Sequence, residues 1–236
     1  MEFTTIAGRE CFVFLPDNYE NEETSYPVVY LHGDKSTYAL LKEADFLSDL
    51  SYIIIGIMSK KRLDELTPWP SPSLNSKFPG FGGEGNAYIQ FIETKLKPEV
   101  DLTYRTLASS QSTGITGYSL GGLISIYAAF HTTSFGCFAS MSGSFWYPEF
   151  VPYVTKQSVR NREARFYMSS GDSEGVGHKD RKKDAVTYTK KVYELLVSEV
   201  TSSRVTINWD EGGHHANTHK RYKDALLWFN HNLKNN

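Results

Sequence analysis

The chain of 236 residues has little cysteine and no long apolar run, and each shortage excludes a class of protein. Its two cysteines, Cys11 and Cys137, stand singly in apolar, strand-like segments without the spacing of metal ligands, so we expect buried free thiols and no disulfide framework. No stretch approaches the roughly 20 apolar residues of a membrane span. The N-terminus lacks the basic and apolar regions of a secretory signal. We therefore expect a cytoplasmic protein with no membrane span.

Charge of one sign is also scarce. The chain carries 25 Lys and Arg against 27 Asp and Glu, a formal net charge of −2, with no long run of either sign. The short basic clusters at 60–62 and 179–183 are typical of solvated faces, so no nucleic-acid partner is expected. An apolar content of 40% and a charged content of 22% are those of a soluble globular protein. Because no repeat or linker divides the chain, residues 1–236 are predicted to form a single domain.

Strand-like and helical segments alternate along the chain. Short apolar runs such as 28–31 and 52–57 are typical of strands buried on both faces. The predicted strands are 9–15, 28–31, 52–57, 112–117, 136–141, 164–168 and 205–209, and the predicted helices are 37–50, 87–97, 123–130, 184–200 and 222–233. Pro98 is expected to stop the second helix. This alternation predicts βαβ units, and hence an α/β fold with a mostly parallel central sheet and helices on both faces.

Residues 60–85 depart from this alternation. They contain four prolines, four glycines and several aromatic residues, without periodicity. Loops of this length are usually functional or disordered. The aromatic content favours the first alternative, an ordered loop that covers the mouth of an active site.

The motif G-x-S-x-G occurs twice. In the first copy, 117–121, Ser119 is followed at once by small and apolar residues that predict a buried helix. A serine on a sharp strand-to-helix turn is a nucleophile elbow, in which glycines allow the tight turn and the helix N-terminus offers N–H groups to an oxyanion. In the second copy, 171–175, Ser173 lies between two carboxylates and no helical pattern follows. Ser119 is therefore the candidate nucleophile.

Residues that could complete a catalytic site follow the ends of several predicted strands. Ligands bind outside the carboxyl ends of the strands in an open α/β sheet. A serine hydroxyl needs a base to take its proton, and a histidine, with an unperturbed pKa of about 6.5, suits that task. The capable residues at the strand ends are His32, Asp34, Ser119, Asp172, Glu174, His214 and His215. Serine, then acid, then histidine is the chain order of α/β-hydrolase triads.

Short motifs spread along nearly the whole chain match one known family. They are 26–33 (Y-P-V-V-Y-L-H-G), 82–84 (G-G-E), 97–100 (K-P-E-V), 104–106 (Y-R-T), 117–122 (G-Y-S-L-G-G), 142–146 (S-G-S-F-W) and 212–214 (G-G-H). On these motifs the chain resembles the esterase D-like (putative esterase) family of α/β-hydrolases, although 109–112 (S-S-Q-S) is more polar than usual there. The family includes S-formylglutathione hydrolases, feruloyl and short-chain acyl esterases, siderophore trilactone esterases and mycolyltransferases. The resemblance implies a single-domain α/β-hydrolase fold and a serine esterase without a cofactor.

A role for each triad candidate follows from the chemistry and from this resemblance. Ser119 would attack the ester carbonyl. His214 matches the family's histidine and would act as the base, with His215 as its rival. The family pattern G-x-x-acid places the acid at Glu174, ahead of Asp172, which would then be a turn residue. The acid would hold the imidazole tautomer and stabilise the imidazolium.

Two further groups of residues are expected around the triad. The oxyanion hole should be the backbone N–H groups of Leu120, directly after the nucleophile, and of Asp34, after a supporting His32-Gly33. Trp69, Trp146 and Tyr147 either line an acyl or aromatic pocket or pack in an ordinary core, and the sequence leaves both interpretations open.

The favoured function is hydrolysis of small or medium acyl esters, small-molecule substrates, with water resolving an acyl-enzyme. A siderophore trilactone (catecholate) esterase would use the same triad, and it predicts basic side chains around the mouth, for which Lys60, Lys61 and Arg62 are the candidates. The lack of a secretory signal disfavours a cell-wall acyltransferase, and the complete triad disfavours a non-catalytic binding protein. No metal is expected, because His215 and His219 have no third ligand beside them.

Overall fold

The sheet at the centre of the molecule explains where the strand ends gather. The computed structural model describes residues 1–74 and 79–234, and in this part of the chain the strands form one eight-stranded sheet of order β1-β2-β4-β3-β5-β6-β7-β8. The strands are β1 (Glu2–Ile6), β2 (Arg9–Phe14), β3 (Val28–Gly33), β4 (Ile53–Met58), β5 (Thr113–Tyr118), β6 (Cys137–Met141), β7 (Arg165–Gly171) and β8 (Val205–Asp210). From β4 across to β8 all neighbouring strands are parallel, whereas β1 and β2 are antiparallel. The expected α/β class and mostly parallel sheet are confirmed.

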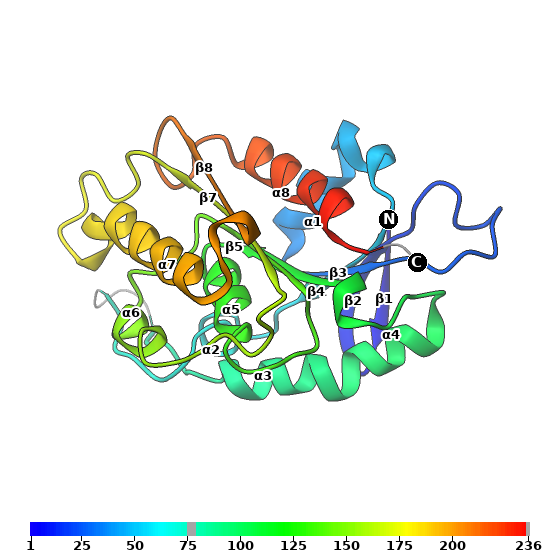
Figure 1. Cartoon of the computed structure of the whole chain (residues 1–236), viewed down its shortest axis with the longest axis horizontal. Coiled ribbons are helices and arrows are strands. Elements are labelled where there is room, and N and C mark those ends of the chain that lie inside the picture. Colours follow the sequence, from blue (N-terminus) through cyan, green and yellow to red (C-terminus); the bar gives the residue numbers. More distant parts are fainter. Residues whose placement is uncertain (75–78, 235–236) are drawn as a thin grey trace.

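Helices cover both faces of this sheet (Figure 1). α1 and α8 lie on one face, and α3 to α7 lie on the other. The helices are α1 (Lys35–Lys42), α2 (Arg62–Glu65), α3 (Gly85–Phe91), α4 (Lys97–Thr103), α5 (Leu120–Ala128), α6 (Phe150–Val154), α7 (Ala185–Val200) and α8 (Thr218–Asn232). No helix of the described residues is both long and apolar enough to cross a membrane.

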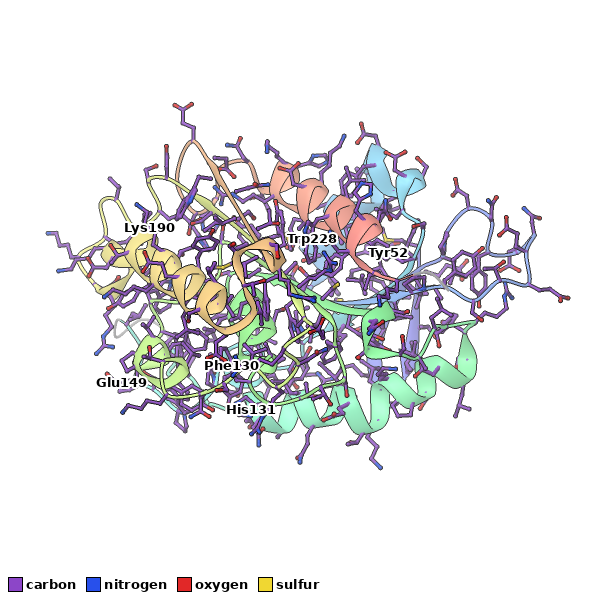
Figure 2. The ribbon with its side chains drawn as sticks, viewed as in Figure 1. Tyr52, Phe130, His131, Glu149, Lys190 and Trp228 are labelled. Atoms are coloured by element: carbon purple, nitrogen blue, oxygen red, sulfur yellow. The ribbon has the colours of Figure 1, made fainter. Side chains whose placement is uncertain are left out.

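Alternate residues of the central strands enter two separate cores. On β3, Val28 and Tyr30 pack into the core beneath α5, and Val29 and Leu31 pack into the core beneath α1 and α8. The side-chain period of two in a strand produces this division. Figure 2 shows Trp228 on α8 with Tyr52 close by, and the Tyr52 hydroxyl donates to the carbonyl of Leu226 at 2.7 Å. The sheet is therefore buried on both faces, which explains its continuous apolar runs.

Two predicted helices have different limits. The helix expected at 37–50 ends at Lys42, because Ala44 is extended (φ −81°, ψ 129°), and a short 3₁₀ helix, Asp45–Asp49, follows. The break places the Phe46 ring in the core. The helix expected to stop at Pro98 instead continues to Thr103, because a π-helical segment, Ile92–Leu96, lies directly before α4. That wider turn leaves room for the proline ring and uses no N–H from it.

The N-terminal segment and the long loop add two elements that the sequence pattern did not predict. β1 extends the sheet beyond β2 with a half-exposed edge. Within 60–85 the described residues form α2 and an antiparallel bridge between Ser71 and Phe81. Residues 75–78 of that predicted loop lie outside the described chain.

The sheet order places the candidate residues together. Asp34 directly follows β3, Ser119 follows β5, Glu174 lies three residues after β7, and His214 follows β8. Because these strands are parallel, all four residues lie at the carboxyl edge of the sheet, where open α/β sheets bind ligands.

Candidate active site

Ser119 occupies a strained turn between β5 and α5. Its φ of 60° and ψ of −116° are costly for a residue with a side chain, and such strain persists only where the surroundings enforce it. The enforcing contacts are backbone hydrogen bonds: the Ser119 N–H donates to Met141 O at 2.9 Å, and its carbonyl accepts from the N–H groups of Leu123 and Ser144 at 3.0 and 3.1 Å. The turn projects the hydroxyl above the sheet edge, as expected of a nucleophile elbow.

The glycines of the elbow allow strand and helix to touch. A Cβ on Gly117 would lie 2.8 Å from the backbone of Gly121, and a Cβ on Gly122 would lie 2.5 Å from Ser140 Oγ. On the other side, a Cβ on Gly121 would press on the His32 side chain at 3.2 Å. Real Cβ atoms do not approach backbone or side chains as closely as 2.8 Å, so the first two positions require glycine for packing.

A continuous line of hydrogen bonds joins serine, histidine and carboxylate. His214 Nε2 lies 3.1 Å from Ser119 Oγ, and His214 Nδ1 lies 2.9 Å from Glu174 Oε2. The other carboxylate oxygen of Glu174 accepts from the Gly171 N–H at 3.0 Å and from Arg221 Nη1 at 3.2 Å. Burial of Glu174 by itself raises its pKa, but the hydrogen bond and charge of His214, with the Gly171 N–H, outweigh it and lower that pKa to about 2.

The rival residues lie elsewhere. Asp172 is exposed, and its Oδ1 accepts from the Gly212 N–H at 3.0 Å, which is a turn contact. His215 is exposed beside His214, with ring centroids 4.9 Å apart. Ser173 lies in a turn of the loop after β7 with no helix behind it. The structure therefore brings together Ser119, His214 and Glu174. The rivals Asp172, His215 and Ser173 lie outside this hydrogen-bonded line.

Two polar residues beside the triad were not singled out from the sequence. Ser144 Oγ is buried and lies 3.1 Å from Ser119 Oγ, so the nucleophile has a second hydroxyl neighbour besides His214. Arg221, in the first turns of α8, is 1% exposed and contacts Glu174. Ser144 belongs to the S-G-S motif at 142–144, and this motif could have identified it from the sequence. Arg221 had none, because a basic residue on an amphipathic helix indicates a solvated face.

The two expected oxyanion donors lie on either side of the nucleophile. Leu120 is the first residue of α5, and Asp34 is the N-cap of α1, where its carboxylate accepts from Thr37 N at 2.9 Å and Ser36 Oγ at 2.6 Å. Burial raises the pKa of the Asp34 carboxyl, but these hydrogen bonds and the nearby Arg62 lower it overall. Neither the Leu120 nor the Asp34 N–H donates to another described residue.

His32 supports the loop that carries Asp34. It is 1% exposed, and its Nδ1 lies 2.9 Å from the Tyr88 hydroxyl. Burial, with a smaller contribution from the charge of Arg62, lowers the pKa of His32 to about 3. The side chain is therefore neutral at any pH where the protein works, which suits a packing role beneath the turn.

One largely apolar cavity of about 370 Å³ opens beside the nucleophile. Its described lining comes from the long loop, the turn at Ser119, the segment after β6, the loop after β7 with the start of α7, and the loop after β8. The lining residues are Leu63, Ser73, Leu74, Pro79, Phe81, Ser119, Leu120, Ser144, Trp146, Glu174, Gly175, His178, Lys182, Ala185, His214 and His215. Of the three expected pocket aromatics only Trp146 is among them. Tyr147 is 2% exposed and donates to Trp69 O at 2.5 Å, while Trp69 Nε1 donates to Pro148 O at 3.0 Å, so both pack behind the wall.

A second cavity of about 370 Å³, more polar, lies on the other side of Ser119. It is lined by His32, Asp34, Ser36, Thr37, Leu40, Arg62, Tyr118, Ser119, His214, His215, Thr218 and Tyr222. Arg62 donates to Tyr118 O at 2.9 Å and forms no ion pair with a carboxylate of residues 1–74 or 79–234. Of the basic cluster at 60–62, this arginine is the member that reaches a cavity beside the nucleophile.

The described residues hold no group of three His, Cys, Asp or Glu side chains arranged to bind a metal ion. His219, the expected partner of His215 in such a site, packs its ring at 5.6 Å from that of Phe46. The polar atoms at the sheet edge instead form the hydrogen-bonded line of Ser119, His214 and Glu174.

Comparison with known proteins shows the family of this chain. The family model described as "Putative esterase" matches residues 7–232. An uncharacterized protein, YbbA of Bacillus subtilis (strain 168), is 32% identical over 232 residues, which cover 94% of this chain and 93% of YbbA.

Solved structures share the fold. An IroE-like serine hydrolase from Shewanella oneidensis superposes with a TM-score of 0.79 at 20% identity, covering 96% of this chain and 79% of that one. The siderophore hydrolase EstA from Aspergillus nidulans gives 0.74 at 17% identity, with coverages of 98% and 94%. The enterobactin esterase FES from Shigella flexneri gives 0.68 at 19% identity and covers 94% of this chain, which spans about half of FES (54%).

Proposed function

The chain belongs to the "Putative esterase" family and is an esterase, and we propose that it is a serine carboxylic ester hydrolase acting on small or medium acyl esters. One observation carries the proposal. Ser119 Oγ, on the strained turn after β5, is linked through both nitrogens of His214 to the buried carboxylate of Glu174. A hydroxyl in this setting can lose its proton to the imidazole as it attacks.

The reaction would proceed through an acyl-enzyme. Ser119 Oγ attacks the ester carbonyl carbon while His214 Nε2 takes the hydroxyl proton, and Glu174 stabilises the imidazolium that forms. The N–H groups of Leu120 and Asp34 donate to the oxyanion, and loss of one such donor typically costs about 3–4 kcal/mol in the transition state. His214 then gives its proton to the departing alcohol. Water, deprotonated by the same imidazole, attacks the acyl-enzyme and releases the acid.

The space on either side of the nucleophile supports a substrate with two distinct halves. The first cavity is largely apolar, with Phe81 and Trp146 in its lining, and suits an acyl chain or an aromatic group. The second cavity is polar and contains Arg62. A volume of about 370 Å³ in each suits groups of small or medium size.

A siderophore trilactone esterase is the second candidate, favoured by Arg62. Arg62 lines a cavity beside the nucleophile, and although its charge acts on the Asp34 carboxylate in the same cavity, the two form no close ion pair. Its guanidinium could therefore bind the phenolate oxygens of a catecholate. The solved structures of similar fold include proteins described as an enterobactin esterase and a siderophore hydrolase. An Arg62→Gln variant separates the candidates: it should raise KM for a catecholate trilactone while leaving p-nitrophenyl butyrate hydrolysis within about threefold.

The proposal is tested by single-turnover labelling with a fluorophosphonate, read by intact mass and peptide mapping. The wild-type protein should gain one adduct on the peptide that contains Ser119, and Ser119→Ala should gain none. Ser173→Ala is the matched control, because it removes the serine of the second G-x-S-x-G copy, and it should label as the wild type does. No adduct on the folded wild-type protein would refute the triad and favour a binding protein. Product analysis in the presence of added alcohols then distinguishes hydrolysis from acyl transfer.

A further inference from the structure

Arg221 has an unusually complete set of partners for a buried side chain. It lies in α8 and is 1% exposed. Its Nε and Nη2 donate to the two carboxylate oxygens of Asp210, at the end of β8, at 2.7 and 2.6 Å. A bidentate pair of this length is strong and fixes the plane of the guanidinium. Arg221 is therefore held rigidly at the carboxyl edge of the sheet, beside the triad.

The remaining donors of Arg221 reach the segments that carry the triad. Nη1 lies 3.2 Å from Glu174 Oε1 and 3.1 Å from the carbonyl of His214, and Nη2 lies 3.2 Å from the carbonyl of Gly213. The guanidinium thus contacts the acid directly and holds the backbone of the loop that carries the base. Gly171 makes room for it, because a Cβ there would lie 2.7 Å from Nη2.

The same nitrogen also reaches the nucleophile's side of the site. Nη1 also lies 2.5 Å from Ser142 Oγ and 3.2 Å from the Tyr118 hydroxyl oxygen. Its two N–H groups are therefore shared among four acceptors: these two oxygens, Glu174 Oε1 and the His214 carbonyl. Tyr118 directly precedes the nucleophile, and its hydroxyl in turn donates to the carbonyl of His214. Ser142, at the end of β6, has a φ of 49°, a conformation that costs free energy for a residue with a side chain. Arg221 therefore joins the ends of β5, β6, β7 and β8 through one planar group.

The two carboxylates differ in how closely they contact Arg221, and this difference explains why the arginine does not neutralise the charge of Glu174. Asp210 makes two short contacts with Arg221, whereas Glu174 makes one longer contact. The positive charge is thus offset mainly by Asp210, and Glu174 retains its negative charge toward His214. The hydrogen bonds to Oε1, from Arg221 and from the Gly171 N–H, leave Oε2 as the oxygen that faces Nδ1.

We propose that Arg221 is a positioning residue of this active site, which fixes the carboxylate of Glu174 and the His214 loop while Asp210 offsets its charge. This inference rests on the proposed function, because it assigns Arg221 a role in the same triad. A lysine cannot replace it: one ammonium cannot span both oxygens of Asp210 and also reach Glu174 and the two loop carbonyls.

The first test compares kcat and KM for p-nitrophenyl butyrate in Arg221→Met, Arg221→Lys and the wild type. We expect kcat to fall on the order of 10–100-fold in both variants, the usual effect of removing a group that orients a site residue, with KM changed less than about threefold. Lys97→Met is the matched control. Lys97 is also a largely buried cation, paired with Asp101 at 2.7 Å, but it contacts Ala108 before the amino end of β5, away from the site. It should lose stability without losing kcat.

The second test uses the pH profile of kcat/KM, which a purely structural role would not move in a defined direction. In Asp210→Asn the charge of Arg221 is no longer offset, so a further positive charge in the site is disfavoured and the acidic limb of kcat/KM should move to lower pH. In Arg221→Met the charge of Asp210 is not offset, so the limb should move to higher pH, each by on the order of one unit. The double variant should return it toward the wild-type position. The titratable and charged groups that contact His214 are Tyr118, Glu174, His215 and Arg221, and Asp210 acts through Arg221. The two cavities that His214 lines add His32, Asp34, Arg62, His178, Lys182 and Tyr222.

The outcomes separate this inference from the proposed function. Wild-type protein that neither labels nor hydrolyses esters would refute the function, and the inference with it. If the wild type is active, two results would refute the positioning role alone. One is an Arg221→Met variant that retains kcat within threefold, and the other is an acidic limb that moves in the same direction in Asp210→Asn and in Arg221→Met. Circular dichroism and thermal melts verify folding of each variant. If Arg221→Met does not fold, Arg221→Lys provides the kcat comparison, and Asp210→Asn alone provides the pH test, in which an acidic limb that does not move to lower pH would refute the positioning role.

Discussion

Replacing Glu174 with glutamine should reverse the tautomer of His214, the proposed base. The exchange keeps the shape of the side chain but turns one oxygen into an NH₂ group. At the Oε1 position two donors point in, the Gly171 N–H at 3.0 Å and Arg221 Nη1 at 3.2 Å, and neither can accept. The amide oxygen must therefore occupy that position, which places the NH₂ at the Oε2 position, 2.9 Å from His214 Nδ1.

The consequence for the base follows from hydrogen-bond directions. An NH₂ facing Nδ1 donates to it, so the imidazole proton must reside on Nε2. That nitrogen lies 3.1 Å from Ser119 Oγ and can then no longer accept the hydroxyl proton. The same exchange of a triad acid for its amide lowers kcat by about 10⁴ in a Ser-His-Asp triad, which corresponds to about 5 kcal/mol of transition-state free energy. We expect a loss of this size in Glu174→Gln.

Steady-state hydrolysis of p-nitrophenyl butyrate and the fluorophosphonate labelling rate should both report this loss. Asp172→Asn is the matched control, an exposed acid in the same loop. Its Oδ1 accepts from the Gly212 N–H, and an amide oxygen can do the same, so activity should stay within about twofold. Glu174→Gln with more than about a tenth of wild-type kcat, or an equal loss in Asp172→Asn, would refute the assignment of the acid.

Four further results are expected. Ser144→Ala removes the second hydroxyl contact of the nucleophile and should lower kcat about fivefold, as the loss of about 1 kcal/mol predicts, with unchanged labelling stoichiometry as the control measurement. His214→Gln should lower kcat by at least 10² and His215→Gln by less than about threefold, and the reverse order would exchange their roles. Gly117→Ala should lower Tm by roughly 4–8 °C, because its Cβ would meet helix backbone 2.8 Å away. The depressed pKa of Glu174, about 2 against 4.5, contributes stability that is present above pH 4.5 and is lost as the pH falls toward 2, up to about 3 kcal/mol, so Glu174→Gln should flatten acid unfolding curves over that range.

The parts of the fold that the sequence predicted are those determined by local pattern. Buried parallel strands appear as continuous apolar runs, and β3, β4 and β8 lie within a residue or two of the predicted ranges. The α/β class followed from the alternation of such runs with helical segments. β5 lacks such a run, because Thr113–Tyr118 contains little large apolar surface. Its glycines have a packing purpose instead, since Phe229 and Gly121 occupy the space that side chains would fill.

The elements that differed depend on contacts distant in sequence. The apolar spacing of 37–50 continues past Lys42, yet the chain leaves the helix at Ala44 so that Phe46 can pack against the first turns of α8. Pro98 is a helix breaker by propensity, but the π-helical turn before it removes the clash. A single sequence contains no local signal for either event, because in both the tertiary packing outweighs the propensity of the segment.

The candidate site divides in the same way. Ser119 and the two possible acids were visible because each follows a strand end and has a motif of its own. For the aromatic residues the sequence left two interpretations open, and the structure places only Trp146 in the cavity lining, whereas Trp69 and Tyr147 pack against each other. The same aromatic residue types occur in the lining of a site and in the core that supports it, so the sequence does not distinguish the two placements.

Arg221 shows why the polar support of such a site is hard to find in a sequence. Charged residues at the start of a helix are usually solvated, and α8 has the amphipathic pattern in which a basic side chain faces water. Burial of this one becomes favourable only when Asp210, the ends of three other strands and two loop carbonyls converge on it, and no local window contains them together. A buried charge without such partners would cost several kcal/mol. The complete set of partners therefore explains why an arginine is tolerated here, and it is the basis for the positioning role that we propose for it.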